Sequence, residues 1–502
     1  MSVISDLRAA AARTPAKARA PVAIVDIGSN SVRLVVYEGL SRVAATLQNE
    51  KSICGIGRDM VTSGRLHDEG CREALESLSR FRMIADGLNV DYRDAVATAA
   101  ARDAANGRDF IRQAEKAWGR PIRILAGEDE ARIAAEGVVA GIPDADGMVA
   151  DLGGGSLDMV SVRQGVTGHA YTLPFGPLRL MDQAKGDPDK ARDIVDKGLR
   201  SVTDMSCNTL YAVGGIWRSL ARIDMEAQNY PLHVLQDYSI PRGRALRLCK
   251  ILAGLSKESA RKIKVVSKRR AESLPYGAVV LERLLEAGNI KDVVISAYGL
   301  REGLLYARLP ADERAKDPLV EFARATNARE ARVAAHAREM LEWTAPLFEG
   351  ETANEARIRA ASAFFSDVAW RRHPDDRAPG AFAQVLNAPF AGARHRERAM
   401  VAASVFHRYS GDEDFPQHMA LQGLLDKDDE HRALVLGLTW RFAFSLSASA
   451  SGELASYRLR LTPSKVILEV PARREAIAGE PVQKRLGELA AVLGRKGEIQ
   501  VG

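Results

Sequence analysis

The sequence VAIVDIGSNSVRLVVYE, from Val22 to Glu38, decides how this chain folds. An apolar run ends at a carboxylate, Asp26, a short turn of small polar residues follows, and a second apolar run begins at Val32. Apolar, β-branched runs on both sides of such a turn predict a β-hairpin. The small residues Gly28 to Ser31 leave backbone N–H groups free to face a ligand. We therefore expect this turn to hold an anion.

The same pattern occurs again in MVADLGGGSLDMVSV, from Met148 to Val162. An apolar strand delivers Asp151, and three glycines with Ser156 form the turn. Consecutive glycines let the backbone approach an anion closely, because they carry no Cβ. Two such units, separated by about one domain length, indicate a duplicated fold with phosphate held between the halves.

The composition limits the class of protein. A chain of 502 residues, 46% hydrophobic and 27% charged, is typical of a globular protein with several domains. The net charge of +6 permits a polyanionic partner. The aromatic content of 6% argues against base stacking, so we expect no nucleic acid.

The expected location is the cytoplasm. The four cysteines form no CxxC pair, which favours free thiols in a reducing compartment. No apolar window reaches the length of about 18 residues that a membrane helix needs. The basic N-terminal segment, residues 1–20, lacks the apolar core of a signal peptide, and we expect a disordered tail there.

Helices and strands alternate over the first three fifths of the chain. Apolar periodicity predicts helices at 68–88 and 108–118 and strands at 92–97 and 209–213, so an α/β layer structure is expected. Further elements are predicted at 121–125, 127–140, 272–286 and 292–296, and a helix after Gly299. From residue 310 the pattern becomes helical, and strands at 455–461 and 465–470 with a helix at 481–493 close the chain.

Two features of this region have a plain structural reading beside the functional one. The acidic residues Glu128, Asp129 and Glu130 begin a helix, where carboxylates stabilise the first turn by facing the positive end of the dipole. The glycine turn at Gly214 and Gly215 opens another helix; such junctions bind phosphate, but they are also common as tight turns.

The ordered set of motifs resembles the exopolyphosphatase/guanosine pentaphosphate phosphohydrolase family of the actin/Hsp70/sugar-kinase superfamily. The motifs are DIGSNSVRLVVYE, ATAAARDAAN, GEDEAR, DLGGGS, AVGG and GLREG, in that order between Val22 and Leu309. The resemblance implies an α/β fold of two duplicated actin-like (ribonuclease H-like) domains, then a mainly helical, HD-like domain and a small α+β tail. The expected boundaries are 21–142, 143–309, 310–445 and 446–502.

The chain departs from the family pattern at Ile216 and Trp217, which replace smaller residues after the third glycine turn, and at two places that bear on its chemistry. Leu157 and Asp158 stand where the family commonly has threonine and glutamate after the glycine turn, which removes a hydroxyl and shortens the acid. The His-Asp pair of an HD site appears as Ser366 and Asp367. Because an HD metal site needs both residues of the pair, we predict that this domain is not a second catalytic centre.

Hydrolysis of a terminal phosphoanhydride needs phosphate neutralisation, an aligned water and a group that orients the water. The resemblance assigns the last role to Glu130. Arg102 suits a bidentate phosphate contact because of its planar fork of donors. The expected phosphate-binding residues are Gly28, Ser29, Asn30, Ser31, Arg102, Gly153, Gly154, Gly155 and Ser156. Asp151, with Asp26 and Asp158, is expected to hold Mg²⁺ or another divalent ion such as Mn²⁺. Weaker candidates are Thr98, Gly214, Gly215 and Arg270.

The leading hypothesis is a homodimeric, Mg²⁺-dependent exopolyphosphatase that releases orthophosphate from inorganic polyphosphate. Within the same family, the alternative is hydrolysis of guanosine pentaphosphate, and a sensor that binds guanosine tetra- or pentaphosphate without turnover stays open. A sugar or acetate kinase is a further alternative, although an acid beside the phosphate turn suits water better. Basic residues at Arg371, Arg372 and from Arg394 to Arg398 are expected to line a track for long chains.

Overall fold

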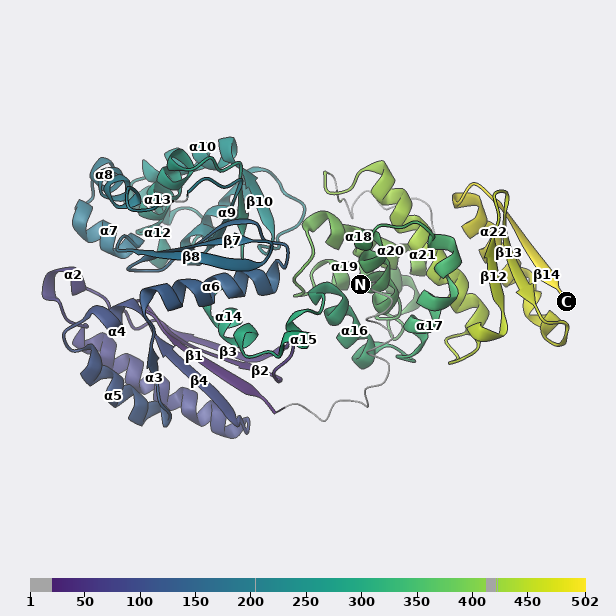
Figure 1. Ribbon diagram of the computed structural model, residues 1–502, viewed down its shortest axis with the longest axis horizontal. Coiled ribbons are helices and arrows are strands. Elements are labelled where there is room, and N and C mark those ends of the chain that lie inside the picture. Colours follow the sequence, from purple (N-terminus) through teal and green to yellow (C-terminus); the bar gives the residue numbers. More distant parts are fainter. Residues whose placement is uncertain (1–19, 204, 412–420, 422) are drawn as a thin grey trace. The chain divides into compact units, whose positions relative to one another are not determined.

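The computed structural model describes residues 20–203, 205–411, 421 and 423–502, and Figure 1 shows its ribbon. The chain divides into two compact units, one ending at Ala315 and the other beginning at Lys316. The predicted N-terminal tail lies outside the described residues except for its last position. Among the described helices, none is long and apolar enough to cross a lipid bilayer.

The unit that ends at Ala315 contains a five-stranded sheet of order β3-β2-β1-β4-β5. Its strands are β1 (Val22–Ile27), β2 (Val32–Tyr37), β3 (Thr46–Ser52), β4 (Tyr92–Ala97) and β5 (Arg123–Ile124). The predicted hairpin is confirmed: β1 pairs antiparallel with β2, and Asp26 lies opposite Arg33. Strand β4 pairs parallel with β1 on its other side. Strand β5 is shorter than predicted, since only two of its residues pair with β4 at the edge of the sheet.

The same unit contains a six-stranded sheet of order β10-β11-β9-β6-β7-β8. Its strands are β6 (Gly147–Leu152), β7 (Leu157–Arg163), β8 (Val166–Leu173), β9 (Thr209–Val213), β10 (Tyr238–Pro241) and β11 (Asp292–Ile295). The β6/β7 hairpin repeats the first one, with Asp151 opposite Asp158. Strand β9 pairs parallel with β6, as β4 does with β1. The duplication predicted from the two motifs is therefore present in the strand order, and Asp26 and Asp151 hold equivalent positions.

Helices cover the outer face of each sheet (Figure 1). On the first sheet, α3 (Asp68–Gly87) and α5 (Gly107–Trp118) bury Phe81, Phe110 and Trp118 against the strands. On the second sheet, an apolar core forms with α7 (Pro177–Ala184), α8 (Pro188–Leu199), α9 (Gly215–Ala227), α10 (Arg242–Ala253) and α13 (Leu274–Ala287). The shorter helices of the unit are α2 (Met60–Ser63), α4 (Ala99–Asp103), α11 (Lys257–Arg261), α12 (Lys268–Ala271) and α15 (Ala311–Arg314).

Two helices are exchanged between the halves of this unit. Helix α6 (Gly127–Gly141) follows the first sheet in sequence, yet its buried residues pack with Val149 and Val160 of the second sheet. Helix α14 (Leu300–Ala307) follows the second sheet, yet Leu304 packs with Ile24 of the first. The inner face of each sheet is therefore covered by a helix that is connected to the other sheet.

Helices α6 and α14 cross at a close contact between backbones. A Cβ atom at Gly303 would lie far inside van der Waals distance of the Ile133 carbonyl, and one at Gly137 would overlap the Gly299 carbonyl. No side chain fits between the two helices at these points. The crossing holds the first turn of α6, which carries Glu130, at a set position between the sheets.

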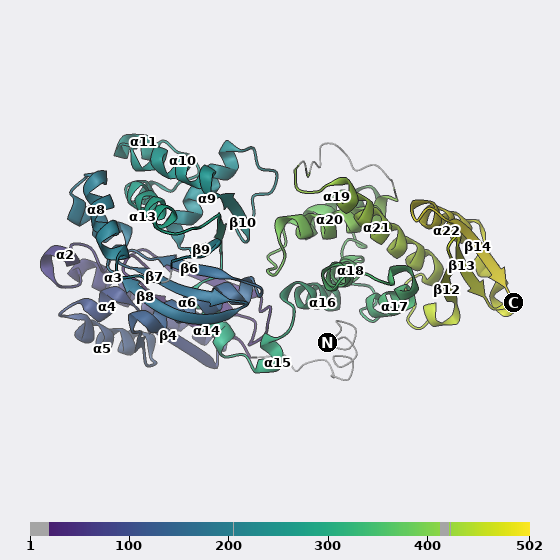
Figure 2. The ribbon, with the colours of Figure 1, turned by 45° about the horizontal axis from the view of Figure 1, so that its top comes forward.

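The unit that begins at Lys316 is mainly helical (Figure 2). Its helices are α16 (Pro318–Glu330), α17 (His336–Trp343), η2 (Ala345–Phe348), α18 (Ala353–Phe365), η3 (Pro374–Asp376), α19 (Arg377–Leu386), α20 (His395–Ser410), α21 (Lys427–Ser447), η5 (Leu454–Ser456), η6 (Ala472–Ala478) and α22 (Glu480–Val492). A three-stranded sheet of order β12-β13-β14 closes the unit, with β12 (Arg458–Leu461), β13 (Lys465–Val470) and β14 (Lys496–Val501). Strand β14 was not predicted, since its largely exposed sequence KGEIQV has little apolar pattern.

We predict that Gly303→Ala destabilises the protein by about 2 kcal/mol or more, because the added methyl group forces α6 and α14 apart. Displacement of α6 should also lower any activity that depends on Glu130. Urea unfolding of the purified variant measures the change.

The matched control for this substitution is Gly87→Ala at the end of α3, where a Cβ meets no atom within 4 Å. This change should be neutral or stabilising by up to about 1 kcal/mol, because alanine favours a helix more than glycine does. Equal effects of the two substitutions would show that the crossing does not require glycine.

Candidate functional site

The turns of the two hairpins have the same closed geometry. The Gly28 N–H donates to the Ser31 carbonyl at 3.0 Å, and the Gly153 N–H donates to the Ser156 carbonyl at 3.0 Å. In each hairpin, the turn begins two residues after the strand aspartate and is closed by the same hydrogen bond. The remaining turn amides are left for a ligand, as backbone N–H groups in such concave turns bind anions.

The structure brings these two turns together. A Cβ built at Gly154 would lie 3.6 Å from the Ser29 Cβ, and one at Gly155 would lie 3.7 Å from the Ser29 Oγ. The predicted phosphate-binding turns of the two halves are thus neighbours across the cleft. The first turn is also held from behind, since its Ser29 and Asn30 carbonyls accept hydrogen bonds from Gly57 and Gly55.

Glu130 and Arg102 contact each other at the edge of this cleft. Arg102, from α4, donates to the Glu130 carboxylate at 3.3 Å and to the Leu125 carbonyl at 3.2 Å. The Glu130 side chain is only 15% exposed. The other two acids of the same turn, Glu128 and Asp129, are 61% exposed and pair with Arg132. Only the third acid of the helix start therefore faces the site.

The carboxylates of the site are held close enough to interact strongly. Burial, Asp158 and Asp151 raise the pKa of Glu130, against the opposing effect of Arg102. Burial also raises the pKa of Asp158, and it raises the pKa of Asp151 to about 6. We call Asp26, Glu130, Asp151 and Asp158 the acidic group. Their raised pKa values mean that the ionised forms repel one another where water is scarce.

The predicted metal ligands come from both hairpins. Among the described residues, no three histidine, cysteine, aspartate or glutamate side chains converge closely enough to hold a metal ion by themselves. Asp26, on the first hairpin, is near enough to add to the effect of burial in raising the pKa of Asp151 on the second. Asp151 and Asp158 remain direct neighbours across β6 and β7.

This pair of carboxylates still fits a magnesium ion. Mg²⁺ is usually bound by one or two carboxylates and completes its octahedron with water and substrate phosphate oxygens. One Asp158 oxygen accepts a hydrogen bond from the Ser156 hydroxyl at 3.0 Å. The other oxygen, Oδ1, is buried without a well-aligned hydrogen bond in the described part of the chain, although the nearby Thr172 hydroxyl opposes the rise that burial causes in the pKa of Asp158. A buried carboxylate oxygen that lacks a well-aligned donor favours a bound cation.

Beside Asp26 of the acidic group, two cations face each other across neighbouring strands. Asp26, Arg33 and Lys51 form one row across β1, β2 and β3. Like charges directly opposite each other destabilise a sheet. Burial and the neighbouring arginines, first among them Arg270 and Arg33, lower the pKa of Lys51 to about 8. In the second half the equivalent row is Asp151, Asp158 and Thr172.

Three arginines from the other elements extend this positive charge. Burial and Arg301 lower the pKa of Arg218, on α9, to about 10. We call Arg33, Lys51, Arg218, Arg270 and Arg301 the cationic group. Within the described residues, no member of the group forms an ion pair. Cations without a paired carboxylate, among which Arg33, Lys51 and Arg218 have their pKa lowered by burial and by neighbouring arginines, favour a bound polyanion.

The weaker candidates take different places. Thr98 is buried at the end of β4, and its N–H donates to the Ile27 carbonyl at 3.1 Å. Gly214 has a φ of 114°, and a Cβ there would lie 2.5 Å from the Leu152 carbonyl, so this glycine is needed for the turn itself. Gly215 leaves room for the Arg270 guanidinium, which lies 2.9 Å from a built Cβ. Of the weaker set, Arg270 joins the cationic group.

Sequence reasoning missed Arg33, Lys51 and Arg218. Arg33 lies inside the hairpin motif, but its role depends on the β2/β3 pairing that places Lys51 opposite it. That register is not visible in the sequence, because a shift by one residue would move Lys51 to the other face of the sheet. The available signal was the charged side chain of Arg33 within the apolar run of β2, and that of Lys51 near the end of β3.

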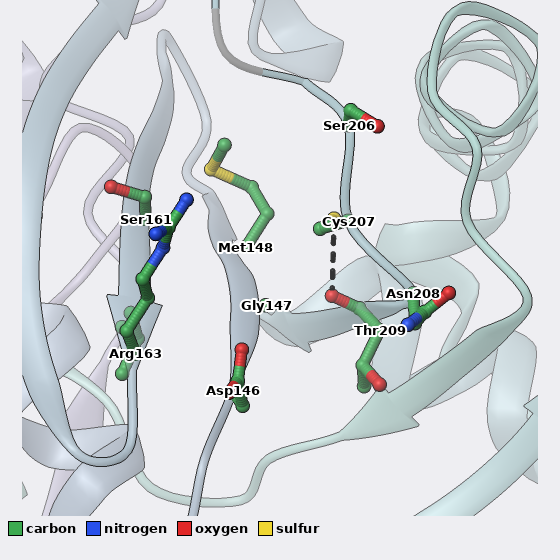
Figure 3. A pocket seen from close by; sticks show the side chains of 10 residues that line it. Asp146, Gly147, Met148, Ser161, Arg163, Ser206, Cys207, Asn208 and Thr209 are labelled. Atoms are coloured by element: carbon green, nitrogen blue, oxygen red, sulfur yellow. Dashed lines mark hydrogen bonds between the residues drawn. The ribbon is translucent and has the colours of Figure 1, made fainter.

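Two cavities lie near the second sheet. One, of about 730 Å³, opens beside Arg102 and the first turn of α6 and reaches Thr172 on β8. The other, of about 530 Å³, lies where β6 and β9 begin, between Asp146, Arg163 and Cys207 (Figure 3). None of the predicted site residues lines this second cavity. The first cavity is therefore the one that adjoins the acidic group.

Relatives of known name resemble this chain. Retrograde regulation protein 2 of Saccharomyces cerevisiae is 28% identical over 372 residues, which cover 64% of this chain and 60% of that protein. The chain thus spans less than two thirds of that relative's length. Exopolyphosphatase 1 of Mycobacterium tuberculosis is 28% identical over 307 residues, which cover 58% of this chain and 88% of that protein.

Solved structures agree with the fold. The Ppx/GppA family member of Aquifex aeolicus matches with a TM-score of 0.50 and 25% identity, over 57% of this chain and 96% of that one. An exopolyphosphatase of Cytophaga hutchinsonii matches with a TM-score of 0.53 and 23% identity, over 57% and 97%. The latter likeness concerns the fold alone.

Family models match both units of the chain. The model described as "Exopolyphosphatase, C-terminal" matches residues 319–500. The model of the Ppx/GppA phosphatase family matches residues 35–312, which is more than half of the chain and includes the second hairpin turn, Arg102 and the acidic group except Asp26. On this match, the chain belongs to the Ppx/GppA phosphatase family.

Proposed function

We propose that this protein is an exopolyphosphatase, which hydrolyses the terminal phosphoanhydride bond of inorganic polyphosphate and releases orthophosphate. The observation that carries the proposal is the gathering of both groups at the hairpin turns, since Asp26 lies opposite Arg33 and interacts with Arg301 and Lys51, and Asp151 interacts with Arg218 and Arg301. An extended polyanion satisfies the cationic group, and its terminal phosphate reaches the acidic group. The name of the mycobacterial relative supports the same substrate.

The terminal phosphate lies between the two hairpin turns. Backbone N–H groups and the hydroxyls of Ser29, Ser31 and Ser156 neutralise its oxygens, as preorganised donors do in phosphoryl transfer. The Arg102 guanidinium, 3.3 Å from Glu130, places a planar pair of donors between the phosphate and that carboxylate. These contacts hold the phosphorus in line with a water beside Glu130.

Glu130 orients this water and accepts its proton. The water oxygen forms a bond to the terminal phosphorus, the bond from that phosphorus to the bridging oxygen breaks, and the bridging oxygen stays with the shortened chain. The raised pKa of Glu130 makes its ionised form a stronger base. The positive charge of Arg102 favours that ionised form at the same time.

Asp151 and Asp158 are the residues that would hold Mg²⁺ or Mn²⁺. When bound, the ion supplies positive charge to the phosphate oxygens. The chain's own part is to present the two carboxylates from paired positions on β6 and β7 and to fix Asp158 through the Ser156 hydroxyl. The shorter acid at this corner, compared with the family's usual glutamate, is thus compensated by a hydrogen bond from the turn.

We further propose that the unit after Lys316 holds no second catalytic centre. Asp367, the acid of the expected His-Asp pair, accepts hydrogen bonds from the Arg332 backbone and guanidinium at 2.8 to 3.2 Å. Arg408 lies 3.7 Å from the same carboxylate. The aspartate is therefore neutralised by guanidinium groups, and a metal would have to displace them.

One residue of the basic track expected on this unit, Arg398, needs a correction. Arg398 is 1% exposed and donates to the carbonyls of Leu386, Ala388 and Phe390, so it cannot contact a chain at the surface. Its guanidinium instead satisfies the carbonyls of the segment after α19. Arg396 pairs with Asp426 and Asp429. We therefore expect the polyphosphate chain to bind to the cationic group of the first unit.

We expect Glu130→Gln to lower orthophosphate release from long-chain polyphosphate by about 100-fold or more, because the amide cannot accept the proton. Binding of polyphosphate should persist, since the cationic group is unchanged. Steady-state phosphate release and a filter-binding assay measure the two quantities, with guanosine pentaphosphate as a parallel substrate.

Asp109→Asn is the matched control, because this acid in the first turn of α5 is 63% exposed, pairs with Arg112 and does not line the cavity beside Arg102. It should keep nearly full activity. Phosphate release that is equally low in both variants would contradict the role of Glu130. If neither substrate turns over in the wild type while guanosine nucleotides bind, the proposed activity itself is wrong.

Binding of polyphosphate should weaken as the pH rises through about 8, because Lys51 then loses its charge. In the free protein, Lys51 carries its positive charge below about pH 8 and loses it above that pH. A bound polyanion stabilises the charged form, so Lys51 loses its proton at a higher pH in the complex. Lys51→Ala should bind more weakly at neutral pH and lose this step. Lys51→Arg should keep tight binding at pH 9, and a step that persists in both variants would assign it to another group.

Removal of divalent metal by a chelator should abolish phosphate release, and Mg²⁺ should restore it. Asp158→Asn should require a higher Mg²⁺ concentration for half-maximal activity, by about 10-fold, because one of the two carboxylates is lost. Mg²⁺ should also raise the melting temperature of the wild type more than that of the variant. An unchanged Mg²⁺ requirement would remove Asp158 from the metal site.

A further inference from the structure

The cavity of about 730 Å³ begins where the reaction takes place. Arg102 lines it and also donates to Glu130 at 3.3 Å. Thr172 lines it and lies directly opposite Asp158 in the register of β7 and β8. The inner end of the cavity is therefore formed by residues that contact or adjoin the acidic group. Its outer end is lined by the exposed residues His169 and Ser201.

The charges of this cavity differ from those of the cationic group. Arg132, at the cavity wall, pairs with Glu128 at 3.1 Å and lies 3.8 Å from Asp129. Arg102 pairs with Glu130 and Asp103. Each cation of the cavity thus has a carboxylate beside it, whereas no member of the cationic group has an ion pair among the described residues. An anion in the cavity is held weakly.

This difference matters after the bond is broken, because two anions then leave the same position. The shortened chain is held by the cationic group, none of whose members lines this cavity. Orthophosphate has to leave by another side if the chain is to stay bound for the next cleavage. The cavity is large enough for a hydrated phosphate, since pockets for small ligands measure about 300 to 1,000 Å³.

We propose that the cavity beside Arg102 is the exit for orthophosphate, separate from the side on which the polyphosphate chain is bound. The inference rests on the proposed exopolyphosphatase activity, and it adds the route by which orthophosphate leaves the site. Orthophosphate moves from the turns past Arg102 and Thr172 and leaves between His169 and Ser201. The shortened chain advances from the cationic group into the vacated position, so that many cleavages follow one binding event.

The test narrows the outer end of the cavity and separates cleavage from release. In His169→Trp and Ser201→Trp, rapid-quench sampling measures total orthophosphate, and a fluorescent phosphate sensor in stopped flow measures free orthophosphate. We expect the quenched first turnover to stay within about twofold of wild type and the appearance of free phosphate to slow by about tenfold. Val166→Trp is the control, because Val166 is 71% exposed on the same strand and does not line the cavity.

A second variant guards against misfolding of the tryptophan variants. Ser201→Cys is purified folded and then labelled with a bulky maleimide, with wild type treated in the same way to account for its own cysteines. Only the labelled variant should show delayed phosphate release. The unlabelled variant should behave as wild type.

Three outcomes would contradict the proposed exit or the activity on which it rests. If the delay between cleavage and free phosphate is the same in all variants, the exit is elsewhere. If narrowing abolishes the first cleavage and weakens chain binding, the cavity is the entrance for the chain. If wild type forms no orthophosphate even after quenching, the proposed activity fails, and this result is distinct from the other two.

Discussion

The crossing of α6 and α14 is the contact on which the rest of the first unit depends. Each helix is connected to one sheet and packs on the other, so the two halves are held together through these helices. The contact is possible only because Gly137 and Gly303 leave no side chain between the backbones. Close packing of this kind transmits displacement, since interiors are as dense as crystals. The position of Glu130, at the start of α6, is therefore set by packing several turns away.

The duplicated hairpins have diverged in charge while keeping their geometry. Both place an aspartate one residue before the end of the first strand, and both close their turns by the same hydrogen bond. Opposite that aspartate stands Arg33 in the first half and Asp158 in the second. The second strand of the first hairpin therefore adds a positive charge beside its aspartate, and that of the second hairpin adds a second carboxylate. This division lets a single cleft bind a polyanion and still carry a general base.

The two units contribute in different ways. In the first unit, like charges lie unpaired in the cleft, at a cost in stability that a bound ligand would offset. In the second unit, buried charges are paired, as Asp367 is with Arg332 and Arg359 with Glu351. Buried pairs of this kind fix side chains in place, because removal of one partner leaves a costly charge. The contrast separates charges kept for a ligand from charges kept for the fold.

The sequence by itself determined the two hairpins, most of the helices of the first unit and the family. These features rest on local signals: alternating apolar runs, glycine turns and helical periodicity over short stretches. Local signals led to the turn residues and Arg102, and the family resemblance led to Glu130; the structure brings Glu130 beside Arg102, Asp151 and Asp158. Only the tertiary structure decided the exchange of α6 and α14, the facing of Arg33 by Lys51, the short strand β14 and the burial of Arg398. Each of these depends on which distant segments pair and in which register, and the free energy of such pairing comes from contacts that no local pattern records.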